Sequence, residues 1–143
     1  MIVARVALTR FPAAFVRVRG KNDRTREFRA LIDPLSDYCI IPKPDAFWLG
    51  YPEAAQDDPI TMPPNLTTIA TNNGYAQAML IKIREVDLNK SKLRNVDFLA
   101  LDLQQVTGFD VVIGRNFLAS LGLIVEMDYQ NKEMKIKQEV SSS

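Results

Sequence analysis

One aspartate in this chain follows an apolar segment, and a carboxylate at the end of a strand can act as an acid or base or simply as a turn residue. Asp33 ends the mostly apolar segment Phe28-Arg-Ala-Leu-Ile, and Ser36 follows it closely. The chain has no histidine, which excludes His-dependent triads, Cys-His nucleophiles and the usual His-containing zinc sites. Any chemistry must therefore use carboxylates, hydroxyls, amines or the single thiol of Cys39, and we interpret that thiol as a buried small hydrophobe.

A second segment, much later in the chain, has a related pattern. Val111 to Gly114 is a short apolar run that ends in glycine, and Arg115 to Leu118 follow it directly. Such a run is typical of a buried strand. A glycine at its end lets another stretch of backbone approach closely, because there is no Cβ in the way.

Together the two segments resemble the retropepsin family of aspartic proteases. In that family an apolar strand ends in Asp-Thr/Ser-Gly-Ala/Ser, a mobile flap follows, and two apolar residues with Gly-Arg/Asp precede a short helix. Thr71-Asn72-Asn73-Gly74 lies between the two segments here, where the family has its flap. The resemblance covers roughly Phe15 to Ile136. It implies an all-β, acid-protease (retropepsin-like) closed β-barrel with one short C-terminal helix, forming a homodimer.

The resemblance also implies a catalytic mechanism. Two carboxylates about 3 Å apart cannot both ionise, so they share one proton. One carboxylate then activates a water as a base, while the other donates a proton to the carbonyl of the bond to be cleaved. This chain carries one such motif, so the partner of the catalytic Asp33 has to be Asp33 of a second copy. The expected partners are therefore an identical chain and a peptide or protein substrate.

Further site residues are implied by position in the family pattern. Arg115 is expected to support the site by pairing with a carboxylate, either across the dimer or near the site, and the sequence does not identify that carboxylate. The Ser36 hydroxyl is expected to bond the outer oxygen of Asp33. No metal and no cofactor are expected, because Asp97, Asp102 and Asp110 lie on separate segments without ligand spacing. The residues expected to contact substrate come from the Asp33 loop, the flap and the second apolar segment: Leu35, Ser36, Thr71, Asn72, Asn73, Gly74, Val112, Ile113 and Gly114.

Two residues depart from the family pattern. Pro34 replaces a Thr or Ser whose hydroxyl bonds across the dimer axis, and proline has neither that hydroxyl nor a backbone N–H. Leu35 replaces glycine, which keeps the N–H but adds a side chain beside the carboxylates. Two functions therefore stay open. One is a homodimeric aspartic endopeptidase, and the other is a catalytically impaired retropepsin-like dimer that binds peptide or acts as a scaffold.

Composition limits the class of protein. The chain has 143 residues, 47% of them hydrophobic and 24% charged, which is typical of one globular domain. We expect that domain to span residues 1–140, with 141–143 as a frayed tail. A net charge of +1 argues against a nucleic-acid partner. The sequence lacks a secretory signal and an apolar run of about 20 residues, so a cytoplasmic protein without membrane association is expected.

Short segments with period-two alternation predict a β-rich chain. The strongest turn signal is Asn-Gly, within Thr71 to Gly74. A polar turn is expected at Asp87 to Lys92, and a helix over Asn116 to Leu121 with Asn116 as its N-cap. We expect the final hairpin, from Leu123 to Lys137, at the dimer interface. The remaining expected elements are strands at 14–19, 26–32, 93–103 and 110–114 and a helical turn at 45–50. Within 66–83 two extended arms are expected on either side of Thr71 to Gly74, and the segment 80–86 is expected to lead into the polar turn.

Overall fold

The computed structural model describes residues 1–8, 13–52, 66–71, 74–101 and 110–138. For residues 66–71 and 74–77 it describes the backbone alone. Ten strands and two short helices lie within these ranges, so the chain is mostly β, as expected.

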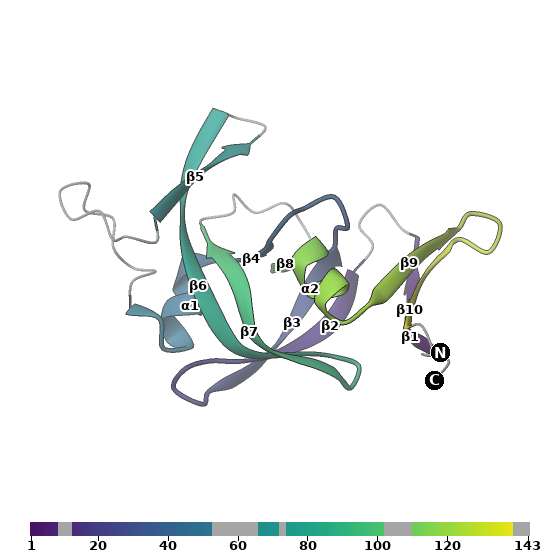
Figure 1. Cartoon of the computed structure of the whole chain (residues 1–143), viewed down its shortest axis with the longest axis horizontal. Coiled ribbons are helices and arrows are strands. Elements are labelled where there is room, and N and C mark those ends of the chain that lie inside the picture. The colour runs from purple at the N-terminus through teal and green to yellow at the C-terminus, as the bar shows by residue number, and fades with distance from the viewer. Residues whose placement is uncertain (9–12, 53–65, 72–73, 102–109, 139–143) are drawn as a thin grey trace.

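Six strands close into a barrel, with a seventh extending it (Figure 1). The strand order is β2-β3-β8-β4-β7-β6, and an additional pairing between β2 and β6 closes the ring. The pairings β3–β8 and β4–β7 are parallel, whereas the others in the ring are antiparallel. The bounds are β2 Ala13–Arg19, β3 Thr25–Ile32, β4 Cys39–Ile41, β6 Gly74–Leu88, β7 Ser91–Ala100 and β8 Val111–Ile113.

Alternation along these strands fills the barrel with apolar side chains. In β3, for example, Phe28, Ala30 and Ile32 are buried, while the residues between them are more exposed. Strand β8 is buried at all three positions, which explains why it reads as a continuous apolar run. The expected closed all-β barrel is thus confirmed.

Two short helices flank the barrel strands. Helix α1 (Lys43–Trp48) confirms the expected helical turn, and it ends just before Gly50, whose φ of 99° stops the helix. Helix α2 (Arg115–Ser120) is the expected C-terminal helix. Among the described residues, neither helix is long and apolar enough to cross a membrane.

A hairpin of β5 (Leu66–Thr71) and the first part of β6 projects from the barrel (Figure 1). It corresponds to the two arms expected around the Asn-Gly turn. Asn72 and Asn73 themselves lie outside the described residues.

The β6–β7 turn is tighter than the expected turn from Asp87 to Lys92. Strand β6 continues to Leu88 and β7 begins at Ser91, so only two residues turn the chain. Both Asn89 and Lys90 have positive φ, at 48° and 75°, which matches the twist of a two-residue hairpin. The Asp87 carboxylate accepts a hydrogen bond from the Lys90 N–H at 2.7 Å and helps to hold this turn.

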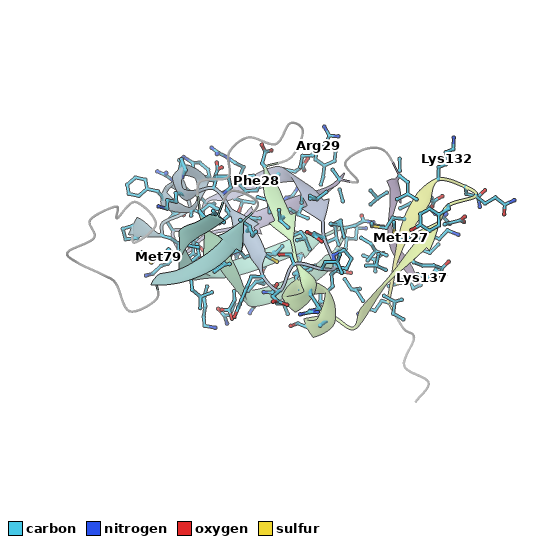
Figure 2. All side chains as sticks on the ribbon, turned by 90° about the horizontal axis from the view of Figure 1, so that it is seen from above. Phe28, Arg29, Met79, Met127, Lys132 and Lys137 are labelled. Carbon is cyan, nitrogen blue, oxygen red and sulfur yellow. The ribbon has the colours of Figure 1, made fainter. Side chains whose placement is uncertain are left out.

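A separate three-stranded sheet, here called the terminal sheet, lies beside the barrel (Figures 1 and 2). Its order is β1 (Ile2–Ala7), β10 (Glu133–Gln138) and β9 (Leu123–Asp128), all antiparallel. The β9–β10 hairpin was expected, but the pairing of β1 with it was not. The core-facing side chains of this sheet, which include Val6 and Ile136, belong to the same buried cluster as the barrel core.

Candidate active site

Asp33 follows directly on β3, and its loop holds it in a defined orientation. The Asp33 N–H donates to the carbonyl of Ile113 at 2.9 Å, which ties the loop to β8. The Leu35 N–H donates to Asp33 Oδ1 at 3.1 Å, and the Ser36 N–H donates to the Asp33 carbonyl at 3.1 Å. The carboxylate is therefore oriented by backbone groups two residues further on, as in an Asx-turn, and it stays half-exposed.

Ser36 does not have the expected role within this protomer. Its hydroxyl donates to the backbone carbonyl of Tyr38 at 2.7 Å. A serine hydroxyl has a single proton to donate, so that proton does not reach the Asp33 carboxylate. The expected bond from Ser36 to Asp33 is wrong, and Ser36 instead stabilises the loop that follows the aspartate.

Gly114 lies where the two family segments meet. A Cβ at this position would be 2.4 Å from the Tyr38 carbonyl oxygen and 2.8 Å from that of Ser36. Both atoms are backbone, so no side-chain movement could make room. The next residue continues the contact, because the Arg115 N–H donates to the Ser36 carbonyl at 2.7 Å. The close backbone approach expected for this glycine is present.

A carboxylate partner was expected for Arg115, and the structure identifies it as Asp37. The Arg115 guanidinium forms an ion pair with this carboxylate, which lies in the loop after Asp33. Both side chains are exposed, and exposed pairs contribute about 0–1 kcal/mol of stability. The ion pair therefore adds little, and the Arg115 N–H bond to the Ser36 carbonyl is the stronger tie between the Asp33 loop and the start of α2.

Asn116 joins three segments beneath the loop. Its Oδ1 accepts a hydrogen bond from the Cys39 N–H at 3.0 Å, and its Nδ2 donates to the Asp97 carbonyl at 2.8 Å. The Asn116 side chain is thus hydrogen-bonded to β4 and β7. The N-cap residue of α2 is Gly114, so no side chain caps this helix. The expected N-cap role of Asn116 is wrong, because these tertiary bonds use both ends of its amide.

Replacing Asn116 with alanine is expected to lower the free energy of unfolding by about 1–3 kcal/mol. The buried Cys39 N–H and the Asp97 carbonyl would each lose a partner. Urea denaturation of the purified variant measures the loss. Ser120→Ala is the matched control in the same helix, since its exposed hydroxyl donates to the Asn116 carbonyl within α2 at 2.7 Å. Equal stability of the two variants would contradict the bridging role.

Cys39 is fully buried, as interpreted from the sequence. Burial raises the pKa of its thiol to about 12, against smaller lowering effects of backbone N–H groups that include Gly114. The thiol is therefore protonated around neutral pH. Its Sγ lies 3.3 Å from the Gly114 N and 3.4 Å from Asn116 Oδ1, so Cys39 packs behind the Asp33 loop and is no nucleophile.

The remaining expected substrate residues lie in different settings. Leu35 is 89% exposed, so its side chain is free to meet a substrate or a second chain. Val112 and Ile113 are buried and support the loop from β8. Thr71 and Gly74 lie at the ends of the projecting β5–β6 hairpin. Among the expected site residues, the structure brings together Asp33, Ser36, Gly114 and Arg115.

Asp37 is a site residue that sequence reasoning missed. No local sequence pattern marks Asp37 as the partner of Arg115, which lies 78 residues further along the chain. The distance of Asp37 from Asp33 in sequence, four residues, is the one clue that it shares the same loop.

Comparison with solved structures shows the same fold elsewhere. The crystal structure of a retropepsin-like aspartic protease from Rickettsia conorii aligns with a TM-score of 0.59, covering 93% of this chain and 88% of that one. The sequence identity is 16%, so the similarity shows the fold alone. A scan against protein-family models and a search of curated proteins each find no match. The chain has the retropepsin-like fold of aspartic proteases, as the sequence resemblance implied.

Proposed function

We propose that this protein is a homodimeric aspartic endopeptidase in which a water activated between two Asp33 carboxylates hydrolyses a peptide bond. The observation that carries the proposal is the Asp33 loop itself. Its half-exposed carboxylate is oriented by a backbone hydrogen bond, and contacts with Gly114 and Arg115 hold the loop against β8. The loop lies within a retropepsin-like barrel. A carboxylate fixed in this way loses little orientational freedom when a reaction begins.

The proposed chemistry requires a second copy of the chain. One protomer supplies one Asp33, whereas a shared proton and an activated water need two carboxylates at close range. A two-fold axis beside the Asp33 loop supplies both from identical surfaces. The exposed side chain of Leu35 lies in this loop, so it belongs to the surface that the partner or the substrate meets.

The substrate class that fits is an extended peptide. Retropepsin-like sites recognise a strand through main-chain hydrogen bonds and pockets for alternate side chains. The projecting β5–β6 hairpin corresponds to the flap that would cover such a peptide, and Thr71 and Gly74 form the last described pair of its two strands. Val112, Ile113 and Gly114 support the floor of the site, and Leu35 and Ser36 border it.

A second function rests on the departures in the Asp33 loop. Pro34 has no hydroxyl to bond across the dimer axis, and Leu35 adds an exposed side chain where the family has glycine. A displacement of about 1 Å at a catalytic group can slow a reaction about 100-fold. A dimer that binds peptides without cleaving them is the function that these two residues favour.

Cleavage that depends on protein concentration tests the proposal. Purified protein is incubated with a mixed peptide library at pH 4 to 6, and mass spectrometry follows the products. If the active species is a dimer, the rate per mole of chain rises with protein concentration until dimers predominate. Peptide binding without any cleavage would favour the second function, and cleavage by a strictly monomeric chain would contradict the two-carboxylate site.

A further inference from the structure

A hollow of about 670 Å³ lies where β2, β1 and the β6–β7 turn meet. Three alanines, Ala4, Ala13 and Ala14, are among its lining residues, so little side-chain bulk covers the backbone of β2 there. Phe15 also lines the hollow, and its large apolar side chain is 66% exposed. This part of β2 is therefore accessible, and it carries an apolar side chain that gains from being covered.

The backbone of β2 has an open edge beside this hollow. Strand β6 pairs with that edge at Arg17, Val18 and Arg19, and no strand among the described residues continues the pairing from Val16 back to Ala13. On its other side β2 pairs with β3 in an unbroken register, without a bulge or a proline. Such an edge is a template for another strand, because its N–H and C=O groups are unpaired.

The hydrogen bonds of β3 show which backbone groups of β2 face the hollow. The Arg29 carbonyl accepts from the Asp110 N–H at 2.9 Å, and the Asp33 N–H donates to the Ile113 carbonyl at 2.9 Å. Odd-numbered residues of β3 therefore point toward β8 and even-numbered residues toward β2, because backbone direction alternates along a strand.

The same alternation continues into β2. The even-numbered residues of β3 lie opposite Ala14 and Val16, which return their hydrogen bonds. The N–H and C=O groups of Ala13 and Phe15 therefore point the other way, toward the open edge. An extended peptide in line with the end of β6 would find a donor and an acceptor on each of these two residues, which is how an added strand is recognised.

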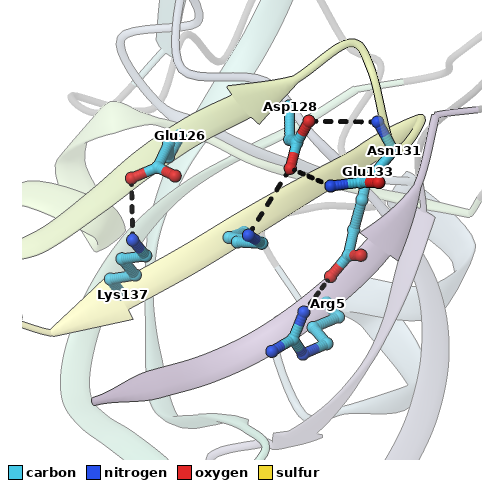
Figure 3. A network of polar contacts seen from close by, with 7 residues as sticks. Arg5, Glu126, Asp128, Asn131, Glu133 and Lys137 are labelled. Carbon is cyan, nitrogen blue, oxygen red and sulfur yellow. Dashed lines mark hydrogen bonds and ion pairs between the residues drawn. The ribbon is translucent and has the colours of Figure 1, made fainter.

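Basic side chains without a carboxylate partner border the same edge. A second hollow, of about 350 Å³, shares Arg17 with the first and is also lined by Lys92. Arg17, Lys90 and Lys92 form no ion pair with any described residue. Arg5 differs from them, because its guanidinium is paired with Glu133 at 2.6 Å (Figure 3). Three positive charges are thus left available to a ligand.

The acidic side chains of the two hollows are mostly engaged. The Glu85 carboxylate lies 3.4 Å from Arg19 Nη2 and 3.8 Å from Arg94 Nε. The Asp87 carboxylate accepts the hydrogen bond that holds the β6–β7 turn. Of the acids described there, Glu27 alone has no such bond, so unpaired basic side chains outnumber unpaired acidic ones. A ligand that carries carboxylates is therefore electrostatically favoured.

We propose that these two hollows form a groove, here called the β2 groove, that binds an extended acidic segment of another protein as an added β-strand. The open edge requires an extended chain, and the unpaired basic side chains require carboxylates on it. Faces alternate along β2, with Val16 buried and Arg17 exposed, so the segment that fits alternates apolar and acidic side chains. The Asp33 loop contributes no residue to the groove, so the inference goes beyond the proposed function and does not depend on it.

A labelled peptide of alternating valine and glutamate is the probe, and fluorescence anisotropy measures its binding. Asp33→Asn protein is used so that no cleavage shortens the probe. A peptide of alternating valine and lysine has the same period and the opposite charge, and it is expected to bind at least about fivefold more weakly. Equal binding of the two peptides would contradict the charge argument and overturn the proposal.

N-methylated probes test strand addition. Methyl groups on the backbone nitrogens of every second residue remove the N–H groups along one edge of an extended peptide and leave those along the other edge. One of the two methylation patterns is expected to weaken binding at least about tenfold, because it removes the hydrogen bonds to Ala13 and Phe15, while the other binds like the unmethylated probe. If both patterns had the same effect, the peptide would not be bound at a single strand edge, and the proposal would be wrong.

Two charge reversals test the place of binding. Arg17 lines both hollows, whereas Lys132 lies in the turn that joins β9 to β10 (Figure 2), and neither forms an ion pair with a described residue. Arg17→Glu is expected to weaken binding of the valine–glutamate probe at least about fivefold and to strengthen binding of the valine–lysine probe. Lys132→Glu should leave both dissociation constants within about twofold of those of the Asp33→Asn parent.

The alternatives give different results. Probe binding that ignores Arg17→Glu would place the peptide elsewhere on the protein and overturn the proposal. If a second copy of the chain filled the groove, sedimentation analysis would show that Arg17→Glu shifts the protein toward monomer, and the choice of occupant would be overturned. Every binding assay uses Asp33→Asn protein, so a protein that cleaves no peptide leaves the β2 groove in place, and failure of the groove leaves the endopeptidase in place.

Discussion

Replacing Asp33 with asparagine is expected to slow peptide cleavage by at least about 10²–10⁴-fold, the range that positioned general acid–base groups contribute. The amide has nearly the same shape, and its oxygen can still accept the hydrogen bond from the Leu35 N–H. It can neither take a proton from water nor share one with a second carboxylate. The loss should therefore appear in the cleavage rate and not in the stability of the fold.

Asp110→Asn is the matched control for that variant. Asp110 is an exposed aspartate just before β8, so the same atom change occurs next to the site but outside it. Mixing provides a second measurement. If each active centre needs one Asp33 from each protomer, an excess of Asp33→Asn chains should suppress wild-type cleavage through mixed dimers. Undiminished cleavage by Asp33→Asn would end the endopeptidase proposal.

Gly114→Ala is expected to lower the free energy of unfolding by about 1–3 kcal/mol, as for overpacked cores, and to displace the Asp33 loop. The added Cβ would stand 2.4 Å from the Tyr38 carbonyl oxygen, so β8 and the loop must separate. That separation also lengthens the hydrogen bond from the Arg115 N–H to the Ser36 carbonyl. Urea denaturation measures the stability, and cleavage assays measure the effect on the site.

Gly122→Asn is the control for Gly114→Ala, because it replaces a glycine whose added side chain would meet no neighbouring atom. Gly122 has a φ of 61°, which asparagine tolerates better than most residues, and an added Cβ would meet no atom within 4 Å. This variant is expected to remain close to wild type in stability and cleavage. If Gly114→Ala were equally mild, the close approach of the two backbone segments would not hold the loop.

Much of the fold could be predicted from the sequence because the patterns that indicate its strands lie within short segments. Period-two alternation marked β2 and β3, and the continuous apolar run marked β8 as buried on both faces. The resemblance at Asp33 and Gly114 then supplied what periodicity lacks, namely the closed barrel and the meeting of two distant segments. The contact of Gly114 with the Tyr38 backbone is the physical reason why a glycine stands there.

The features that escaped prediction depend on partners far away in sequence. Asn116 looks like a helix cap because it precedes a helical pattern, yet it bonds β4 and β7. Arg115 needed Asp37, and no spacing rule connects them. Strand β1 has an alternation interrupted by Arg5, whose side chain is stabilised by Glu133 at 2.6 Å near the other end of the chain.

The dependence of the Asp33 loop on residues 113–116 also affects timing during synthesis. A ribosome produces Asp33 about 80 residues before Ile113, whose carbonyl, together with the side chain of Asn116, orders the surroundings of Asp33. Contacts between such distant residues form late because the intervening chain must first be closed into a loop. A nascent chain therefore carries Asp33 without its ordered surroundings until residues 113–116 have been made.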